Sequence, residues 1–116
     1  GIKKMLLSIN EFRSFLQNTE KTSHIKERNY RFKHLSLNAK PVNGFIAIID
    51  KHHINGAEVH ALYSDGSIRI YNLNTKKLIT VLIARPGQEK RLNPEMQLPQ
   101  NIYNICYRNM KNRYNH

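Results

Sequence analysis

Three short segments of the chain carry side chains whose types and spacing suit acid–base chemistry on a phosphate ester. The first holds His24, Glu27 and Arg28, with Arg31 three residues further on. Residues four apart share a face of a helix, so a helix here would bring His24 and Arg28 together, with Glu27 beside them. A solvated charged helix explains the same pattern, so it marks candidates and is not diagnostic.

The second segment is Glu58-Val59-His60. Alternate residues of a β-strand point to the same face, which would place the side chains of Glu58 and His60 about 6–7 Å apart along it. If Val59 and Ala61 face a layer of helices, Glu58 and His60 face the open side of the sheet. An ordinary solvated sheet face is the alternative interpretation.

The third segment follows a β-prone run and spans Arg85 to Arg91. It contains a rigid Pro-Gly turn and three cations, a combination that suits a phosphate clamp. Its candidate RNA ligands are Arg85, Gln88, Lys90 and Arg91. A solvated loop accounts for the pattern equally well.

Together these segments supply the groups that metal-free RNA cleavage needs. A base removes the proton from a 2′-hydroxyl and an acid protonates the departing 5′-oxygen, while cations stabilise the charge that builds on the phosphate. The eight carboxylates are scattered singly, and Cys106 is the single cysteine. A lone cysteine excludes an internal disulfide and a cysteine-based zinc site, and it suits a core position. We therefore expect neither a metal site nor a cofactor.

The adjacent pair His52-His53 is a weaker candidate for chemistry. Neighbouring side chains point apart on a helix and on a strand, so the two imidazoles would not converge on one group. The pair is therefore interpreted as exposed polar residues before a turn.

Helices are predicted over much of residues 8–50. Ser8 and Glu11 have the spacing of a capping box, which predicts a helix over about residues 9–18. Thr22 or Ser23 offers a second helix start. Asn38 could cap a third helix, with an apolar stripe at Val42, Phe45, Ile46 and Ile49. Gly44 weakens this third helix, and a buried strand over Phe45–Ile49 is the alternative.

After Gly56 the apolar period changes to two, which predicts an antiparallel meander over residues 57–85. Residues 86–99 hold three of the four prolines and are predicted to form a loop. A final apolar stripe predicts a helix over residues 100–112. The predicted fold is α+β in a single domain, residues 1–116: N-terminal helices cover one face of three to four antiparallel strands, followed by a C-terminal helix.

The charge of the protein points to a polyanionic partner. The chain has 116 residues, a net charge of +11 and a sequence pI near 10.1. Nucleic acid, an anionic membrane surface and an acidic protein all fit this balance. No apolar run approaches the ~20 residues of a membrane helix, so stable membrane insertion is not expected, and RNA is the favoured partner.

The order of these elements resembles the Barnase–EndoU–Colicin–RelE superfamily of ribonuclease toxins. The resemblance covers about residues 20–91. It rests on a short polar segment with His24, Glu27 and Arg28, followed by a meander that ends in the strand and turn Leu78–Gln88. Toxin domains of contact-dependent growth inhibition proteins belong to this superfamily.

The resemblance implies a metal-independent endoribonuclease that cuts transfer RNA or messenger RNA, together with a cognate immunity or antitoxin protein. It implies a cytoplasmic site of action, reached in some cases by delivery from another cell within a larger secreted protein. By residue type, it implies His24 or His60 as acid or base, Arg28 and Arg85 as phosphate ligands, and Thr80 as a further candidate. Glu58 has no nearby acidic partner, which leaves the division of roles open.

Two other classes of function remain open. A non-catalytic RNA- or ribosome-binding domain would stack bases on tyrosines such as Tyr30, Tyr63, Tyr71, Tyr103 and Tyr107. A phage or plasmid structural or inhibitor protein would be basic because it meets an acidic partner. A nuclease loses cleavage when His24 or His60 is changed, whereas a binding domain has no cleavage to lose.

Overall fold

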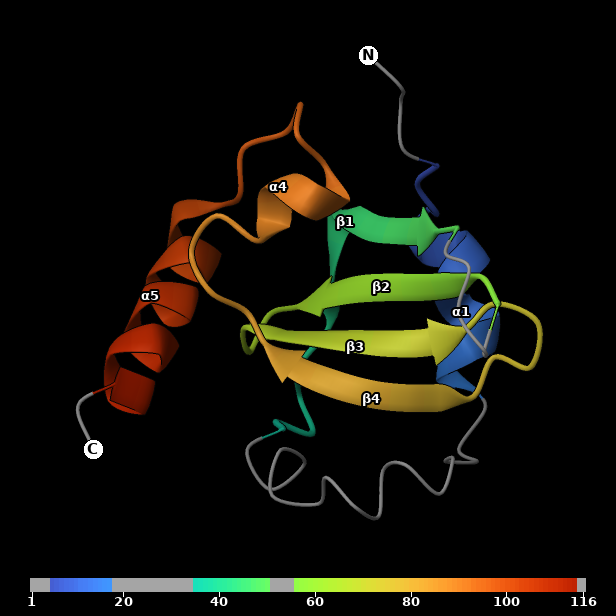
Figure 1. The fold of residues 1–116 in the computed structure, drawn as a ribbon, viewed down its shortest axis with the longest axis horizontal. Coiled ribbons are helices and arrows are strands. Elements are labelled where there is room, and N and C mark those ends of the chain that lie inside the picture. The colour runs from blue at the N-terminus through green and yellow to red at the C-terminus, as the bar shows by residue number, and fades with distance from the viewer. Residues whose placement is uncertain (1–4, 18–34, 51–55, 115–116) are drawn as a thin grey trace.

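A four-stranded antiparallel sheet forms the centre of this computed structural model, which describes residues 5–17, 35–50 and 56–114. The strand order follows the chain, β1-β2-β3-β4 (Figure 1). The elements are α1 (Ile9–Leu16), β1 (Pro41–Ile49), β2 (Glu58–Tyr63), β3 (Ser67–Asn72), β4 (Leu78–Ile83), α4 (Glu89–Leu92) and α5 (Gln100–Tyr114). The α+β fold predicted from the sequence is confirmed, with the C-terminal helix in its predicted place.

Helix α1 begins where the capping box predicts. The Ser8 hydroxyl accepts a hydrogen bond from the Glu11 backbone N–H at 3.1 Å, and the Glu11 carboxylate accepts one from the Ser8 backbone N–H at 3.0 Å. These bonds satisfy N–H groups that have no partner inside the helix. Phe12 and Phe15 are buried on the inner face of the helix.

The meander of β2, β3 and β4 is also confirmed. Leu62 pairs with Ile68 across a turn centred on Asp65 and Gly66. In the next turn, the side-chain oxygen of Asn72 accepts hydrogen bonds from the backbone of two following residues. Polar turn residues of this kind end each strand by bonding to their own backbone.

The prediction of a third helix within residues 38–50 is wrong, because Pro41–Ile49 forms strand β1. Phe45 and Ala47 lie in the core on one face of the sheet, whereas Ile46 lies in the core on the other. A strand buried on both faces needs a continuous apolar run, which also resembles a helical stripe. The strand alternative for Phe45–Ile49 is therefore confirmed. The predicted second helix, near residues 22–31, lies outside the described residues.

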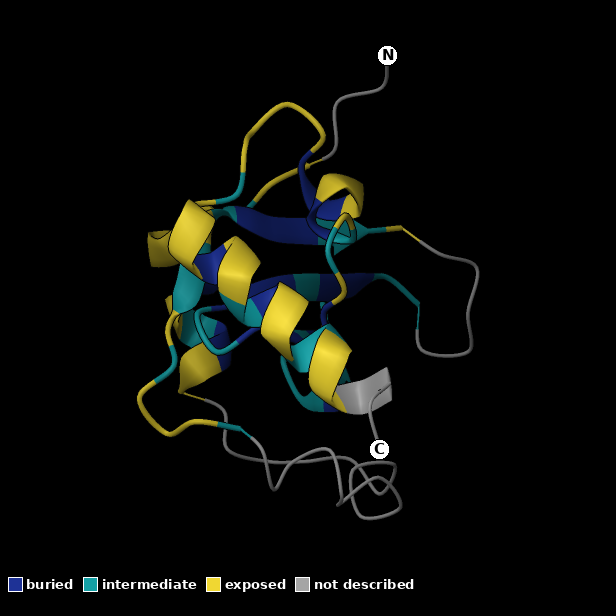
Figure 2. Ribbon diagram, turned by 90° about the vertical axis from the view of Figure 1, so that its left-hand side faces the viewer, coloured by how far each residue is buried: buried dark blue, intermediate teal, exposed yellow. Residues whose placement is uncertain are grey.

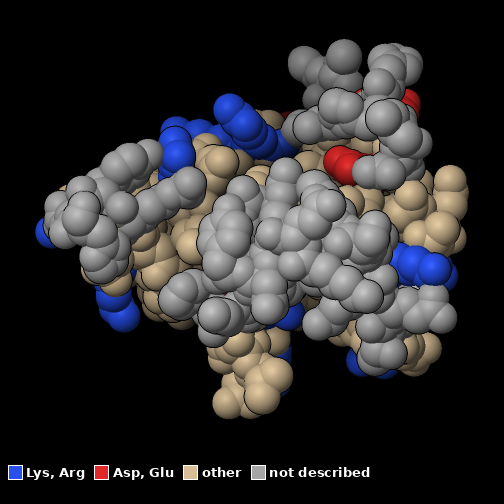
Figure 3. All heavy atoms as spheres, turned by 60° about the horizontal axis from the view of Figure 1, so that its bottom comes forward, with Lys and Arg blue, Asp and Glu red and all other residues tan. Residues whose placement is uncertain are grey.

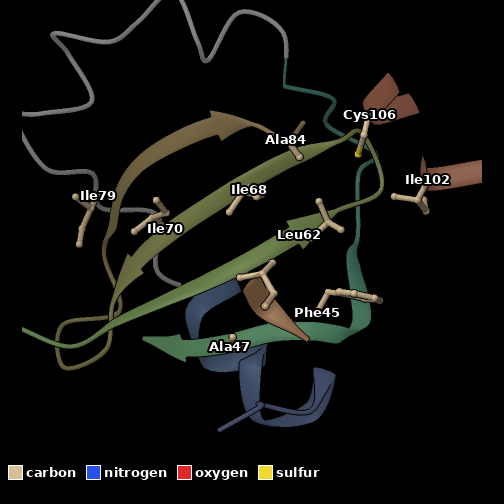
Figure 4. Packing of buried hydrophobic residues seen from close by; sticks show 10 residues of the cluster. Phe45, Ala47, Leu62, Ile68, Ile70, Ile79, Ala84, Ile102 and Cys106 are labelled. Atoms are coloured by element: carbon tan, nitrogen blue, oxygen red, sulfur yellow. The ribbon is translucent and has the colours of Figure 1, made fainter. Parts of the chain in front are cut away.

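Helices pack on both faces of the sheet and not on one face as predicted. On one face, the aromatic rings of α1 pack against a cluster that includes Val59, Ala61 and Tyr71. On the other face, Leu92 of α4 and Ile102 and Cys106 of α5 join a second cluster, ten of whose residues Figure 4 shows. Both faces of the strands are apolar, so both must be covered to remove that surface from water.

Residues 86–99 are not entirely a loop, since they contain the short helix α4. Asn93, just after α4, donates a side-chain hydrogen bond to the Gly44 carbonyl of β1 at 2.9 Å. This bond ties the segment between β4 and α5 to the far edge of the sheet.

Candidate active site

Glu58 and His60 make a direct contact on one face of β2. The Nε2 atom of His60 lies 3.1 Å from Oε1 of Glu58. The alternation of side chains along a strand brings these two residues to the same face, as predicted. A carboxylate in this position can hold the imidazole in one orientation and favour one tautomer.

The face that carries this pair is not an open, solvated one. The side chains of His60 and Glu58 are only 13% and 11% exposed. The expectation of an open side is wrong because Leu62, Ile68 and Ile70 make this face as apolar as its opposite, and α4 and α5 pack on it. The interaction of a partly buried pair is stronger than that of an exposed pair, because water screens it less.

Thr80 lies on the same face as His60. His60 pairs with Ile70 of β3, and Ile70 pairs with Thr80 of β4, so the three residues form one row across the sheet. Residues directly opposite each other on neighbouring strands point to the same side. Two strand spacings separate the Cα atoms of His60 and Thr80 by about 10 Å. The structure therefore brings Glu58, His60 and Thr80 to one region.

The remaining candidates of the first segment are not placed. His24, Glu27, Arg28 and Arg31 lie outside the described residues. Their assignment as acid–base and phosphate-binding groups stays a prediction from the sequence.

The loop after β4 is held by its own side chains. The side-chain oxygen of Gln88 accepts a hydrogen bond from the Arg85 backbone N–H at 2.7 Å, and the Glu89 carboxylate accepts one from the Gly87 N–H, also at 2.7 Å. The side-chain oxygen of Gln88 thus stabilises the turn through its bond to the backbone of Arg85. Arg85, Lys90 and Arg91 are exposed.

Arg85 lies apart from His60, beyond the end of β4. Arg85 follows Thr80 by five residues, which corresponds to about 16 Å of extended chain. Glu58 lies at the opposite end of the meander, where β2 begins. A substrate that used both groups would have to extend along the sheet and past its end, which an RNA strand can do.

A second polar cluster, which sequence reasoning missed, lies on the α1 side of the sheet. The Arg69 guanidinium contacts the Asp65 carboxylate at 3.2 Å and stacks 3.8 Å above the centre of the Tyr63 ring. Asp65 also accepts hydrogen bonds from the Ser67 hydroxyl at 2.6 Å and from the backbone N–H of Ser36 at 3.1 Å. The sequence signal was only a turn motif, with an Asp four residues before an Arg.

The pKa values in this cluster are consistent with a structural role. Burial tends to raise the pKa of Asp65, but the hydrogen bonds from Ser67 and Ser36 and the charge of Arg69 outweigh it and hold the pKa below its ordinary value. Burial raises the pKa of both Tyr63 and Tyr71, whose hydroxyls hydrogen-bond each other at 2.9 Å. In the part of the chain that the structure describes, no buried side-chain N or O lacks a partner.

Cys106 is a core residue, as predicted, and is not placed to act as a nucleophile. It is almost fully buried against the sheet. Burial, helped by the negative charge of Glu89, raises the pKa of its thiol to about 11. A thiol needs to ionise to attack, and this environment opposes ionisation.

The structure also bears on metals, membranes and surface charge. No group of three or more His, Cys, Asp or Glu side chains converges within residues 5–17, 35–50 and 56–114. Among the same residues, no helix has the length and apolar character needed to span a bilayer. Figure 3 shows Lys and Arg side chains at several separate places on the face it displays, and Asp and Glu at fewer.

Comparison with known proteins identifies no relative of the chain. No protein-family model matches it, and neither does any curated protein or solved structure.

Proposed function

We propose that this protein is a metal-independent endoribonuclease of the toxin type, which cuts transfer RNA or messenger RNA by acid–base catalysis. The observation that carries the proposal is the contact between His60 and Glu58, partly buried on a sheet face that also presents Thr80. The net charge of +11 supports RNA as the substrate.

In the proposed reaction, an imidazole takes the proton of a 2′-hydroxyl, whose oxygen then attacks the adjacent phosphorus. The O2′–P bond forms, the P–O5′ bond breaks, and a second group protonates the 5′-oxygen. His60, oriented by Glu58, serves as one of these two groups, and His24 is the candidate for the other. Glu27 is a further candidate beside His24. The products are a 2′,3′-cyclic phosphate and a 5′-hydroxyl.

The remaining candidates position the phosphate chain. Thr80, which is buried on the same face as His60, is a further candidate for positioning the phosphate there. Arg85, Lys90 and Arg91 are exposed cations that can bind neighbouring phosphates, and Arg28 and Arg31 are proposed to do the same. A toxin of this kind acts in the cytoplasm and requires an immunity or antitoxin protein that blocks its surface.

The test is cleavage of total RNA in the presence of EDTA. We expect discrete fragments that end in 2′,3′-cyclic phosphate and no cleavage of DNA, which lacks the attacking hydroxyl. His60→Gln keeps an amide N–H that can reach Glu58 but cannot transfer protons, so the rate should fall about 100-fold to 10,000-fold. Folding is checked by circular dichroism.

His53→Gln is the matched control, since that histidine has no proposed role, and it should cleave at the wild-type rate. The absence of fragments would reject the nuclease proposal. A folded His60→Gln variant with wild-type activity would remove His60 from the reaction.

A non-catalytic RNA-binding domain is the second candidate function. The observation in its favour is the exposure of Tyr103 and Tyr107 on α5, because exposed rings can stack on bases without any chemistry. Salt-sensitive RNA binding without fragments would favour this function.

A further inference from the structure

The outward side of α5 carries a line of aromatic and cationic side chains. Tyr103, Tyr107 and Lys111 follow one another at intervals of four residues and therefore lie along one side of the helix. Ile102 and Cys106, about 100° away around the helix from the residues that follow them, anchor α5 in the core. Figure 2 shows this helix face on, with its outward side mainly exposed. We call Tyr103, Tyr107, Arg108 and Lys111 the α5 stripe.

The α5 stripe combines exposed rings with positively charged side chains. Tyr103 and Tyr107 are 36% and 46% exposed. The sequence of α5 contains no Asp or Glu, while Arg108 and Lys111 are exposed. The ammonium of Lys111 lies 5.7 Å from the centre of the Tyr107 ring. Cations near a helix C-terminus also stabilise the helix by interacting with its dipole. That effect does not explain why two tyrosines are exposed.

A hollow continues the stripe at its N-terminal end. It has a volume of about 430 Å³ and lies between α4, the segment after it, and α5. Tyr103 lines the hollow together with Lys90, Gln100 and Glu95. Lys90 belongs to α4, so the hollow lies between a cation of that helix and the stripe. The carboxylates of Glu89 and Glu95 both line the hollow. They are unfavourable for a phosphate but can accept hydrogen bonds from base amino groups.

We infer that the α5 stripe and this hollow bind single-stranded RNA, with bases stacked on Tyr103 and Tyr107 and phosphates near Arg108 and Lys111. The inference rests on the proposed function for its choice of RNA, and it adds that the substrate is unpaired where it crosses α5. The two rings are about 6 Å apart along the helix axis, so each can take a separate base. Stacking needs an accessible base face, which a duplex does not offer.

The experiment measures binding of a labelled 2′-O-methyl RNA strand by fluorescence anisotropy. This probe cannot be cleaved because its 2′-oxygens are blocked, so binding is read independently of catalysis. Tyr103→Ala and Tyr107→Ala should each weaken binding about tenfold or more, whereas Tyr107→Phe, which keeps the ring, should bind close to the wild type. Lys111→Gln should reduce the salt dependence by about 0.7 in log–log slope.

Two controls separate stacking from general effects. Arg13→Gln removes an exposed cation on α1, and Leu16→Ala removes an exposed apolar side chain on the same helix. Leu16→Ala should leave the affinity for RNA nearly unchanged. Arg13→Gln should reduce this affinity only through the loss of one charge. A duplex probe of the same sequence should bind the tyrosine variants as well as it binds the wild type.

The inference is overturned if both alanine variants, folded by circular dichroism, bind the single strand with wild-type affinity. It is also overturned if they lose affinity for the duplex equally, because the loss would then not come from stacking. A stripe that serves an acidic protein partner would give the first of these results. Failure of the nuclease proposal would appear instead as a lack of RNA fragments with these binding results unchanged.

Discussion

At the scale of single residues, Asp65 is a partly buried carboxylate that has several polar partners. One carboxylate accepts bonds from Ser67 and Ser36 and faces the guanidinium of Arg69. Partial burial makes each missing partner costly, because a desolvated charge keeps only the stabilisation that its neighbours supply. The cluster joins the β2–β3 turn to Ser36, which lies before β1, and so fixes the chain at that end of the sheet.

We predict that Asp65→Asn destabilises the fold at neutral pH by about 1–3 kcal/mol. The pKa of Asp65 is lower in the folded state than its ordinary value near 3.8. The contribution of the Asp65 carboxylate to the free energy of unfolding is therefore complete above that value. It is lost as the pH falls through the folded-state pKa. Urea unfolding at pH 7 and at pH 3 measures the free energy of unfolding of the wild type and of the variant. The difference between the two proteins should be smaller at pH 3.

Asp50→Asn, at an exposed position after β1, is the matched control and should change stability by less than about 0.5 kcal/mol. A difference for Asp65→Asn that stayed the same at both pH values would show that the charge of Asp65 has no part in it.

At the scale of elements, β1 shows how one backbone angle changes the structure of a segment. Gly44 has a φ of +86°, which favours glycine and does not occur within an α-helix. The pairing of β1 with β2 is irregular between Pro41 and Ile46, around this residue. A Cβ at position 44 would also collide with Sδ of Met96, so the strand passes close to the segment after α4.

We predict that Gly44→Ala costs about 2–3 kcal/mol of stability, of which about 1–2 kcal/mol is backbone strain. Gly56→Ala is the matched control, since Gly56 has a φ of +73° with nothing within 4 Å of its added Cβ. That variant should show the strain alone. Thermal unfolding followed by circular dichroism measures both, and Met96→Ala should recover part of the loss at position 44. Equal costs for the two glycine variants would mean that the contact with Met96 contributes nothing.

At the scale of the whole molecule, the apolar core and the excess positive charge occupy different parts of the protein. The core has an apolar cluster on each face of one sheet, and the excess of positive charge lies outside these clusters. Lys90 of α4 and Tyr103 of the α5 stripe both line the hollow, so the cations of these two helices lie on either side of it. An extended polyanion can therefore contact several of them at once.

We predict that affinity for single-stranded RNA falls steeply with salt. Each phosphate that is neutralised contributes about −0.7 to the slope of log affinity against log salt, so about four to six contacts give roughly −3 to −4. Titration of a 2′-O-methyl strand over a series of salt concentrations measures this slope. A flat response would exclude RNA as the natural partner.

The sequence by itself determined the features that depend on near neighbours. The capping box of α1 needs only Ser8 and Glu11, three residues apart, and the meander needs only its two-residue period and its turns. The shared face of Glu58 and His60 follows from strand geometry alone. These features were predicted correctly because the groups concerned interact within a few residues of chain.

Tertiary structure decided the features that depend on distant partners. The apolar run at Phe45–Ile49 fits a helix or a strand, and its pairing with β2 selects the strand. Glu58 and His60 are partly buried because helices from the C-terminal third of the chain pack on their face of the sheet, which the local pattern does not reveal. The row from His60 to Thr80 depends on the register of three strands, and a shift of one residue would turn Thr80 to the opposite face.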